Sequence, residues 1–387
     1  MKRFFQSQTI ATGLAIFSMF FGAGNLIFPL KVGLIAGEKN IWAILGFMLT
    51  GVILPLLGLI AIILFNGDYK AFFNRLGKIP GACFTLFCML IIGPLVAMPR
   101  IVTLSHIMVA PFLGNISLIY FTLLFLSVTF LGTYKESKII NLLGYIISPL
   151  LLLSLVIIIV KGLFVPGEMT HAVNASGLKL FWESIKVGYN TLDVLGAIFF
   201  SSIVITILKE NLKDHSEKSL KKLALMGLKA GIIGVTLLAL IYLGMSYLGV
   251  YHGAGLEHLN EGELFSAISF RILGTQGAII IALAVLMACY STIIALTVVV
   301  SDYLQQTILR NKISYVQALL LVLTVTAIIS NFGLSKILSV SGPFIEAGYP
   351  ALIVLMLCNI AYKIIGFKPV KVPVLITLII SCALYLL

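Results

Sequence analysis

Two long apolar stretches of the chain contain glycine and polar residues where a membrane helix would be uniformly apolar. The first is FSMFFGAGNLIFPL, residues 17–30, with Gly22, Gly24, Asn25 and Pro29. Glycine weakens a helix and proline removes a backbone donor. Within lipid, interrupted backbone is tolerated only where protein or a water-filled cavity satisfies the freed groups. The stretch therefore predicts a discontinuous helix facing a site, and the alternative is a close helix–helix contact through small residues.

The second stretch is VGYNTLDVLGAIFF, residues 187–200, which contains Asn190, Thr191 and Asp193. A carboxylate at membrane depth costs about 2.5–3.5 kcal/mol on insertion scales, so it usually faces the protein interior or a polar cavity. Two interrupted spans at corresponding places in two halves of a chain are the best sequence pointer to a transport site. Phe199 and Phe200 follow this break and are candidates to line an apolar side-chain pocket.

A pair of crossed, broken helices has a defined chemistry. The N-terminus of a half-helix presents free N–H groups and the positive end of a dipole, which suit a carboxylate. The C-terminus presents free carbonyl groups, which suit an ammonium group or a bare cation. A zwitterionic amino acid needs both, and the two breaks together would supply both.

Two charged residues lie inside other apolar spans. Arg100 ends the segment IIGPLVAMPR and would either contact an anionic group of the substrate or pair with a carbonyl or a carboxylate, for which Asp193 and Glu346 are candidates. Glu346 lies between two prolines in the tenth span. It would either bind and release a proton or form an ion pair with Arg100 or Lys229.

Adjacent hydroxyl groups occur in the eighth span, at Ser291 and Thr292. Such hydroxyls often bond back to the preceding helical turn, and from the residues alone this interpretation is favoured. They are also hard oxygen ligands that would suit sodium if they faced an unwound stretch of carbonyl groups.

Composition places the chain in a membrane. Of the 387 residues 60% are hydrophobic and 10% charged, against about 25% charged in soluble domains, and the mean hydropathy is +1.14. The formal charge of +12 does not indicate nucleic acid binding, because the basic residues are confined to short loops between apolar spans. The cysteines and histidines show no metal-ligand spacing, and we expect neither a disulfide framework nor a cleaved signal peptide.

A spanning helix needs about 20 apolar residues, and by that rule the sequence predicts about eleven spans. They lie near residues 8–32, 41–65, 82–111, 116–132, 139–161, 185–208, 223–250, 272–303, 314–330, 336–362 and 372–387. With the N-terminus in the cytoplasm, 17 of the 26 Lys and Arg residues fall in inner loops and 7 in outer loops, leaving 2 within spans. Excess positive charge on the inner side predicts a cytoplasmic N-terminus and an external C-terminus.

The spans divide into two groups of five. Residues 8–161 form the first predicted repeat, residues 185–362 the second, and residues 363–387 an extra helix, all within one transporter domain of residues 1–387. A unit with an odd number of spans must reappear inverted when repeated in tandem. This is the plan of many secondary transporters.

Six motifs occur in a recognisable order. They are FFGAGNLIFPL, IGPLVAMPR, GYNTLDVLGAIFFSSIVI, ACYSTIIALT, SNFGLSK and GYPALIVLML. Over residues 8–362 the chain resembles the branched-chain amino acid:cation symporters, the BrnQ-type permeases. The resemblance implies an all-α, polytopic protein of the leucine-transporter-like class, with a 5+5 inverted-repeat core and discontinuous helices 1 and 6. It also implies sodium- or proton-coupled uptake of leucine, isoleucine and valine across a bacterial inner membrane.

The resemblance also assigns residues. It places the substrate at the two breaks, against Ala23, Gly24, Asn25, Tyr189, Asn190, Thr191 and Asp193. It places sodium between the carbonyl groups near Ser18 and Phe21 and the hydroxyl groups of Ser291 and Thr292, with Asn25 serving both ligands.

The chain departs from the family in two respects and leaves several questions open. Family members usually have a twelfth span, and Glu346 is not expected at its position, which leaves the coupling ion undecided. The oligomeric state also stays open. Other readings are a transporter of another small amine or nucleobase on the same fold, a channel or sensor without coupling, and a membrane enzyme. Since neither a catalytic constellation nor a nucleotide loop is visible, we expect no enzyme activity, no cofactor beyond the coupling ion, and no ATP dependence.

Overall fold

The computed structural model describes residues 2–114, 116–134, 148–171, 174–210 and 217–386. Within these ranges the regular elements are all helical. The N-terminal helices are α1 (Lys2–Phe20), α2 (Ala23–Ala36), α3 (Asn40–Met48), α4 (Leu54–Leu64), α5 (Tyr69–Asn74), α6 (Lys78–Ile92), α7 (Ala97–Val109) and α8 (Leu118–Thr133). They are followed by α10 (Ser148–Phe164), α11 (Gly177–Tyr189), α12 (Asp193–Glu210), α13 (Glu217–His252), α14 (Glu261–Asp302), α15 (Tyr315–Ser330), α16 (Leu334–Ile365) and α17 (Lys371–Leu386). Short π or 3-10 turns are η1 (Gly37–Lys39), η2 (Leu49–Ile53), η3 (Ala110–Phe112) and η5 (Tyr303–Ile308).

The helices are apolar on their outer as well as their inner faces. Large hydrophobic side chains such as Leu131, which is 74% exposed, point away from the protein. Helices that are hydrophobic all round belong in a membrane or a large core. In the described part of the chain, five helical segments are long and apolar enough to cross a membrane. These are Ala23–Leu64, Lys78–Phe112, Leu225–His252, Glu261–Ile308 and Leu334–Ile365.

Five shorter apolar helices accompany these segments, so the chain has the make-up of a multi-pass membrane protein. The count of eleven spans and the orientation of the termini stay predictions. Part of the predicted span 139–161 lies outside the described residues, as do residues 211–216, between the predicted spans 185–208 and 223–250.

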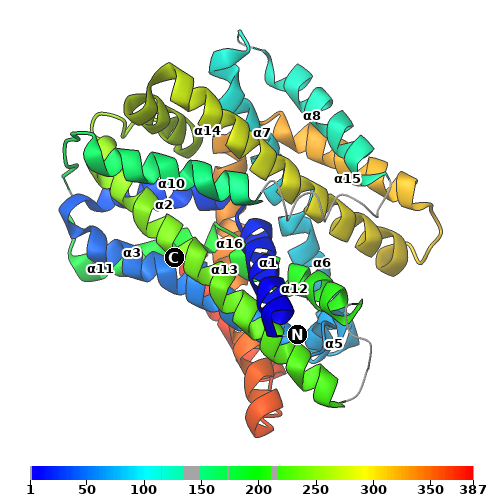
Figure 1. Ribbon diagram of the computed structural model, residues 1–387. Helices are drawn as coiled ribbons and strands as arrows, with labels where there is room; N and C mark the ends of the chain where they lie inside the picture. Colours follow the sequence, from blue (N-terminus) through cyan, green and yellow to red (C-terminus); the bar gives the residue numbers. More distant parts are fainter. Residues whose placement is uncertain (1, 115, 135–147, 172–173, 211–216, 387) are drawn as a thin grey trace.

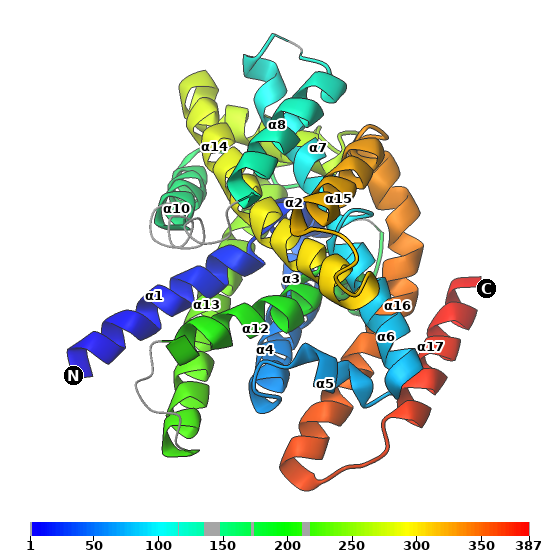
Figure 2. The same cartoon turned by 90° about the vertical axis from the view of Figure 1, so that its right-hand side faces the viewer.

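Helices from the first half of the chain pack against helices from the second half. Helix α13 runs beside both α1 and α2, and α3 packs on α11 (Figure 1). Helix α4 packs on α12, and α7 packs on α14 (Figure 2). Each of these pairs joins one helix from before residue 165 to one from after residue 176, so the two predicted halves share one core.

The chain leaves the helical conformation at two places where the sequence predicts interruptions. Helix α1 ends at Phe20 and α2 begins at Ala23, with Phe21 and Gly22 between them. Helix α11 ends at Tyr189 and α12 begins at Asp193. In the second gap Leu192 adopts a φ of 63°, a left-handed conformation that is unfavourable for a residue with a bulky side chain.

The two gaps lie directly against each other. A Cβ atom added to Gly24 would lie 3.1 Å from the Cα of Thr191 and 3.2 Å from the carbonyl oxygen of Asn190. Only glycine allows backbones to approach this closely without displacing a neighbour. Residues separated by more than 160 positions in the chain therefore meet at one point in the fold.

Candidate functional site

A buried polar network joins the two gaps. The amide nitrogen of the Asn25 side chain donates to both carboxylate oxygens of Asp193, at 2.8 and 2.9 Å. The hydroxyl of Tyr242, on α13, donates to Oδ2 of Asp193 at 2.7 Å and also contacts the Asn25 amide. The side-chain oxygen of Asn25 accepts from the backbone N–H of Gly22 at 3.0 Å. One asparagine thus satisfies a freed backbone donor of the first gap and holds the carboxylate of the second.

The charge of Asp193 is stabilised by neutral donors. Asp193 is only 2% exposed, and both Asn25 and Tyr242 are fully buried. Burying a carboxylate is costly unless hydrogen bonds replace its water, and here three donor contacts do so. Among the described residues, the ion pairs are Lys179–Glu183 and Lys186–Glu346, so no cation neutralises Asp193.

Helix α16 also contacts the residues on both sides of the second gap. The hydroxyl of Tyr349 accepts from the backbone N–H of Val194 at 3.1 Å, which caps one of the free donors at the start of α12. The ring of Tyr349 stacks on that of Tyr189 with centroids 5.0 Å apart. Tyr189 therefore packs against α16, and it is not among the residues that line the cavity described next.

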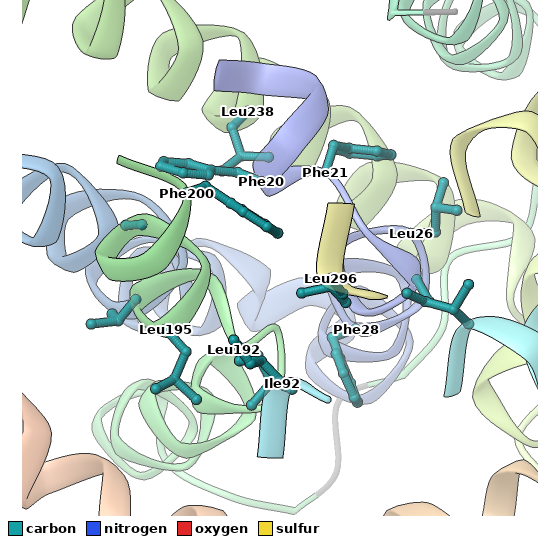
Figure 3. Packing of buried hydrophobic residues seen from close by; sticks show 14 of the residues in the cluster. Phe20, Phe21, Leu26, Phe28, Ile92, Leu192, Leu195, Phe200, Leu238 and Leu296 are labelled. Atoms are coloured by element: carbon teal, nitrogen blue, oxygen red, sulfur yellow. The ribbon is translucent and has the colours of Figure 1, made fainter. Parts of the chain in front are cut away.

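A cavity with an empty volume of about 480 Å³, including its open mouth, lies between the gaps. Its apolar wall combines Leu192 of the second gap with side chains from α1, α6, α7, α12 and α14. Figure 3 shows Phe20, Phe200, Leu192, Ile92 and Leu296 of this wall. Its polar lining comes from Gly22, Ala23, Gly24, Asn25, Arg100, Asn190, Thr191, Asp193 and Thr292.

Six of the predicted substrate residues are thus brought together in one cavity lining. They are Ala23, Gly24, Asn25, Asn190, Thr191 and Asp193. The roles of Asn25 and Asp193 differ in detail from the expectation, since each is the other's hydrogen-bond partner. Thr191 directs its hydroxyl to the carbonyl of Gly188 at 2.8 Å, within the end of α11.

Phe199, which the sequence predicts as a substrate contact, is not among the described residues that line the cavity. Its ring packs edge-on against Tyr69, with centroids 5.3 Å apart, and stacks on Phe73 at 5.9 Å, both on α5. The next residue, Phe200, lines the cavity instead. Successive residues on a helix point about 100° apart, and the rotation of α12 turns Phe200 toward the cavity and Phe199 toward Tyr69 and Phe73.

Arg100 reaches the second gap from α7. Its Nη1 donates to the backbone carbonyl of Asn190 at 2.9 Å, and its Nη2 donates to the Ser341 hydroxyl at 2.6 Å. The predicted carboxylate partners, Asp193 and Glu346, are both bonded elsewhere. Of the two structural roles expected for Arg100, the carbonyl contact is the one observed.

Glu346 lies apart from the cavity. Its carboxylate is 4.0 Å from Nζ of Lys186, and the two side chains are 34% and 64% exposed. It therefore pairs with neither Arg100 nor Lys229, the partners named from the sequence. Partly exposed pairs of this kind contribute little to stability.

The predicted sodium ligands lie beside the first gap. The Thr292 hydroxyl is 3.5 Å from the carbonyl oxygen of Phe21 and 3.1 Å from that of Ala288. Ser291 donates to Ala288 at 2.8 Å, the back-bond expected in an apolar helix. Because the N–H of Gly22 bonds to Asn25, it does not fill the helical role of a donor to the Ser18 carbonyl. Within the described chain, no group of three or more His, Cys, Asp or Glu side chains could hold a metal ion.

Sequence reasoning missed two residues of the network. Tyr242 and Ser341 contact Asp193 and Arg100, respectively. Each is an ordinary polar side chain in a long apolar helix, and its own sequence neighbourhood carries no sign of the partner. Contacts between charged groups and hydroxyl groups that are far apart in the sequence depend on how the helices pack. The hydrophobic periodicity of a single helix does not predict them.

Comparison with protein families matches residues 5–386 to the family described as "Branched-chain amino acid transport protein". The branched-chain amino acid permease BraB of Bacillus subtilis is 36% identical over 368 residues, which cover 92% of this chain and 80% of that permease. The permease BrnQ of the same organism is 33% identical, covering 95% of this chain and 84% of BrnQ.

Solved structures show the same fold at low sequence identity. A manganese transporter of Eremococcus coleocola matches with a TM-score of 0.67 and 15% identity, covering 99% of this chain and 86% of that one. The inward-facing form of Mhp1 matches with a TM-score of 0.65 and 12% identity, covering 97% and 89%. These neighbours show that the chain has a leucine-transporter-like fold.

Proposed function

Because the chain belongs to the branched-chain amino acid transport protein family, we propose that it is a secondary transporter that imports leucine, isoleucine and valine together with a cation. The observation that carries this proposal is the cavity between the two helix interruptions. It combines free backbone ends, one carboxylate and an apolar wall, which are the three features that an aliphatic amino acid requires.

The apolar wall suits an aliphatic side chain. The side chains of this wall contribute no polar group to the cavity; they are those of Phe20, Ile92, Leu192, Phe200 and Leu296. Burying a Val, Leu or Ile side chain is favourable by about 1.5–3 kcal/mol. Because the wall contains no hydrogen-bond partner for a polar side chain, a substrate such as lysine would lose its hydration without compensation.

The polar side of the cavity suits the amino acid's backbone groups. The N–H groups at the start of α2 include those of Ala23 and Gly24, and both residues line the cavity. These groups and the positive end of the helix favour an anion. Asp193, which has no cationic partner among the described ion pairs, is the group in this lining that would accept an ammonium.

We place the coupling cation beside Thr292. Its hydroxyl and the Phe21 carbonyl are two oxygen atoms 3.5 Å apart at the edge of the same cavity. The carbonyl of Ser18 and the hydroxyl of Ser291 are candidates to complete the shell. Sodium is the cation that such neutral oxygen ligands suit; Asp193 is the corresponding candidate if the coupling ion is a proton. Transport would follow from rocking of one helix bundle against the other around this site.

Reconstitution in liposomes tests the proposal. Purified protein should accumulate labelled leucine above its external concentration when a sodium or a proton gradient is imposed, and each gradient is applied separately to identify the coupling ion. A channel or sensor cannot concentrate its ligand, so uptake that stops at equilibrium under both gradients would overturn the proposal.

A competition panel tests the substrate class. Isoleucine and valine should block leucine uptake, whereas lysine and uracil should not. Inhibition by uracil but not by isoleucine would instead support a nucleobase transporter on the same fold. Protein-free liposomes and dissipated gradients are the controls.

A further inference from the structure

Arg100 is the only cation among the described residues that line the cavity. It is 3% exposed and comes from α7. Asp193, the only anion among the described lining residues, is the first residue of α12. The guanidinium lies 6.0 Å from the centre of the Phe28 ring, within the range of a cation–π contact. A permanent positive charge is therefore built into the wall of the substrate cavity.

The partners of Arg100 leave this charge uncompensated. A guanidinium has five N–H donors, and the described acceptors are the Asn190 carbonyl, the Asn190 side-chain oxygen at 3.4 Å and the Ser341 hydroxyl. All three are neutral, and Nε is buried with no acceptor. Among the described residues no ion pair joins Arg100 to a carboxylate.

A buried guanidinium whose hydrogen-bond partners are all neutral is unfavourable unless an anion also binds to it. A buried charge is normally paired, because its lost hydration must be replaced. Many polar side chains could donate a hydrogen bond to a neutral hydroxyl or amide oxygen. An arginine differs from them because it presents a planar fork of donors that matches a carboxylate. A structural anchor for the Asn190 carbonyl would not by itself need a permanent charge.

We propose that Arg100 is the group that recognises the carboxylate of the transported amino acid. The inference rests on the proposed function and specifies one part of it. The described lining then contains one cation for the carboxylate and one anion, Asp193, for the ammonium, so a bound zwitterion is matched at both ends. Arg100 also contacts the unwound Asn190, so substrate binding and the conformation of the second gap would be linked through one side chain.

The test compares two ligands that differ at the carboxylate. Leucine and leucinamide share the ammonium group and the aliphatic side chain, but leucinamide has a neutral amide in place of the carboxylate. Equilibrium binding of each is measured on the purified, intact protein. The wild-type protein should prefer leucine by roughly 30-fold or more, the scale expected for a buried, hydrogen-bonded charge pair. In Arg100→Gln the affinity for leucine should fall by that factor while the affinity for leucinamide changes little.

Two further variants separate recognition from structure. Arg100→Lys retains the charge but not the planar fork, and should keep part of the preference for leucine. Ser341→Ala removes a partner of Arg100 without removing the charge, and should leave the ratio of the two affinities unchanged. Equal binding of leucine and leucinamide by the wild-type protein would overturn the inference without requiring any variant. So would an Arg100→Gln protein that weakens both ligands equally. If the wild-type protein binds neither leucine nor isoleucine, the proposed function itself fails.

Discussion

At the scale of single residues, the site depends on side chains that each satisfy two requirements. Asn25 accepts from Gly22 and donates to Asp193, so it joins both helix gaps. The polar residues of the site could be identified from the sequence because polar residues are rare and costly within membrane-spanning stretches. Their partners were not predictable, since Tyr242 resembles any packing tyrosine and the orientations of Phe199 and Phe200 depend on the rotation of α12.

Thr292 provides a residue-scale prediction with a matched control beside it. Thr292→Ala should raise the sodium concentration for half-maximal leucine uptake by about tenfold or more, because an oxygen contact with a charged group contributes about 1.5–3 kcal/mol. Ser291→Ala should have a smaller effect, since Ser291 is not among the described residues that line the cavity, whereas Thr292 is and its hydroxyl also lies 3.5 Å from the Phe21 carbonyl oxygen. Sodium titrations of uptake measure both. An unchanged value in folded Thr292→Ala would reject this cation site.

At the scale of elements, the close crossing of the two interrupted segments positions the cavity. Gly24 permits the approach to Asn190 and Thr191, and α13 and α16 supply the tyrosines that hold Asp193 and Val194. The location of both gaps could be predicted because glycine, asparagine and aspartate stand out in apolar helices. Which helices would pack around them could not, because a lipid-facing stripe and a core-facing stripe have similar composition.

Gly24→Ala tests the crossing. The added methyl group would meet backbone atoms of the second gap at 3.1 and 3.2 Å, so the two segments must separate slightly. Overpacking of this kind costs about 1–3 kcal/mol, and we expect leucine affinity to fall by roughly 5- to 100-fold.

Gly342→Ala is the control for this substitution. It also adds a methyl group to a glycine within a helix, but with no atom within 4 Å of the new Cβ. It should bind leucine normally. Normal leucine binding by Gly24→Ala as well would show that the close crossing does not position the substrate.

At the scale of the whole molecule, helices from both ends of the chain are interleaved around one cavity. Composition alone predicted a polytopic membrane protein, because an apolar fraction this large cannot be buried in a soluble domain. The number of spans and the inverted relation of the two halves remain predictions, since helical length and hydropathy do not define where the bilayer begins and ends.

The orientation of the chain in the membrane can be tested with a single membrane-impermeant reagent. The excess of basic residues in alternate loops predicts that Lys179 lies outside the cell and Lys70 inside. In a background where the exposed cysteines Cys83 and Cys382 are replaced by serine, Lys179→Cys should react with a membrane-impermeant maleimide in intact cells. Lys70→Cys should react only after the membrane is opened. The reverse pattern would invert the proposed topology.

The central claim is that the two helix interruptions enclose one binding cavity for a branched-chain amino acid. Photo-leucine, whose side chain carries a diazirine, can be cross-linked to the purified protein and the modified peptides identified by mass spectrometry. We predict labelling within residues 19–25 and 190–200, in the apolar wall that contains Phe20, Leu192 and Phe200, and its suppression by excess leucine. Leucine-sensitive labelling confined to other segments would contradict the claim.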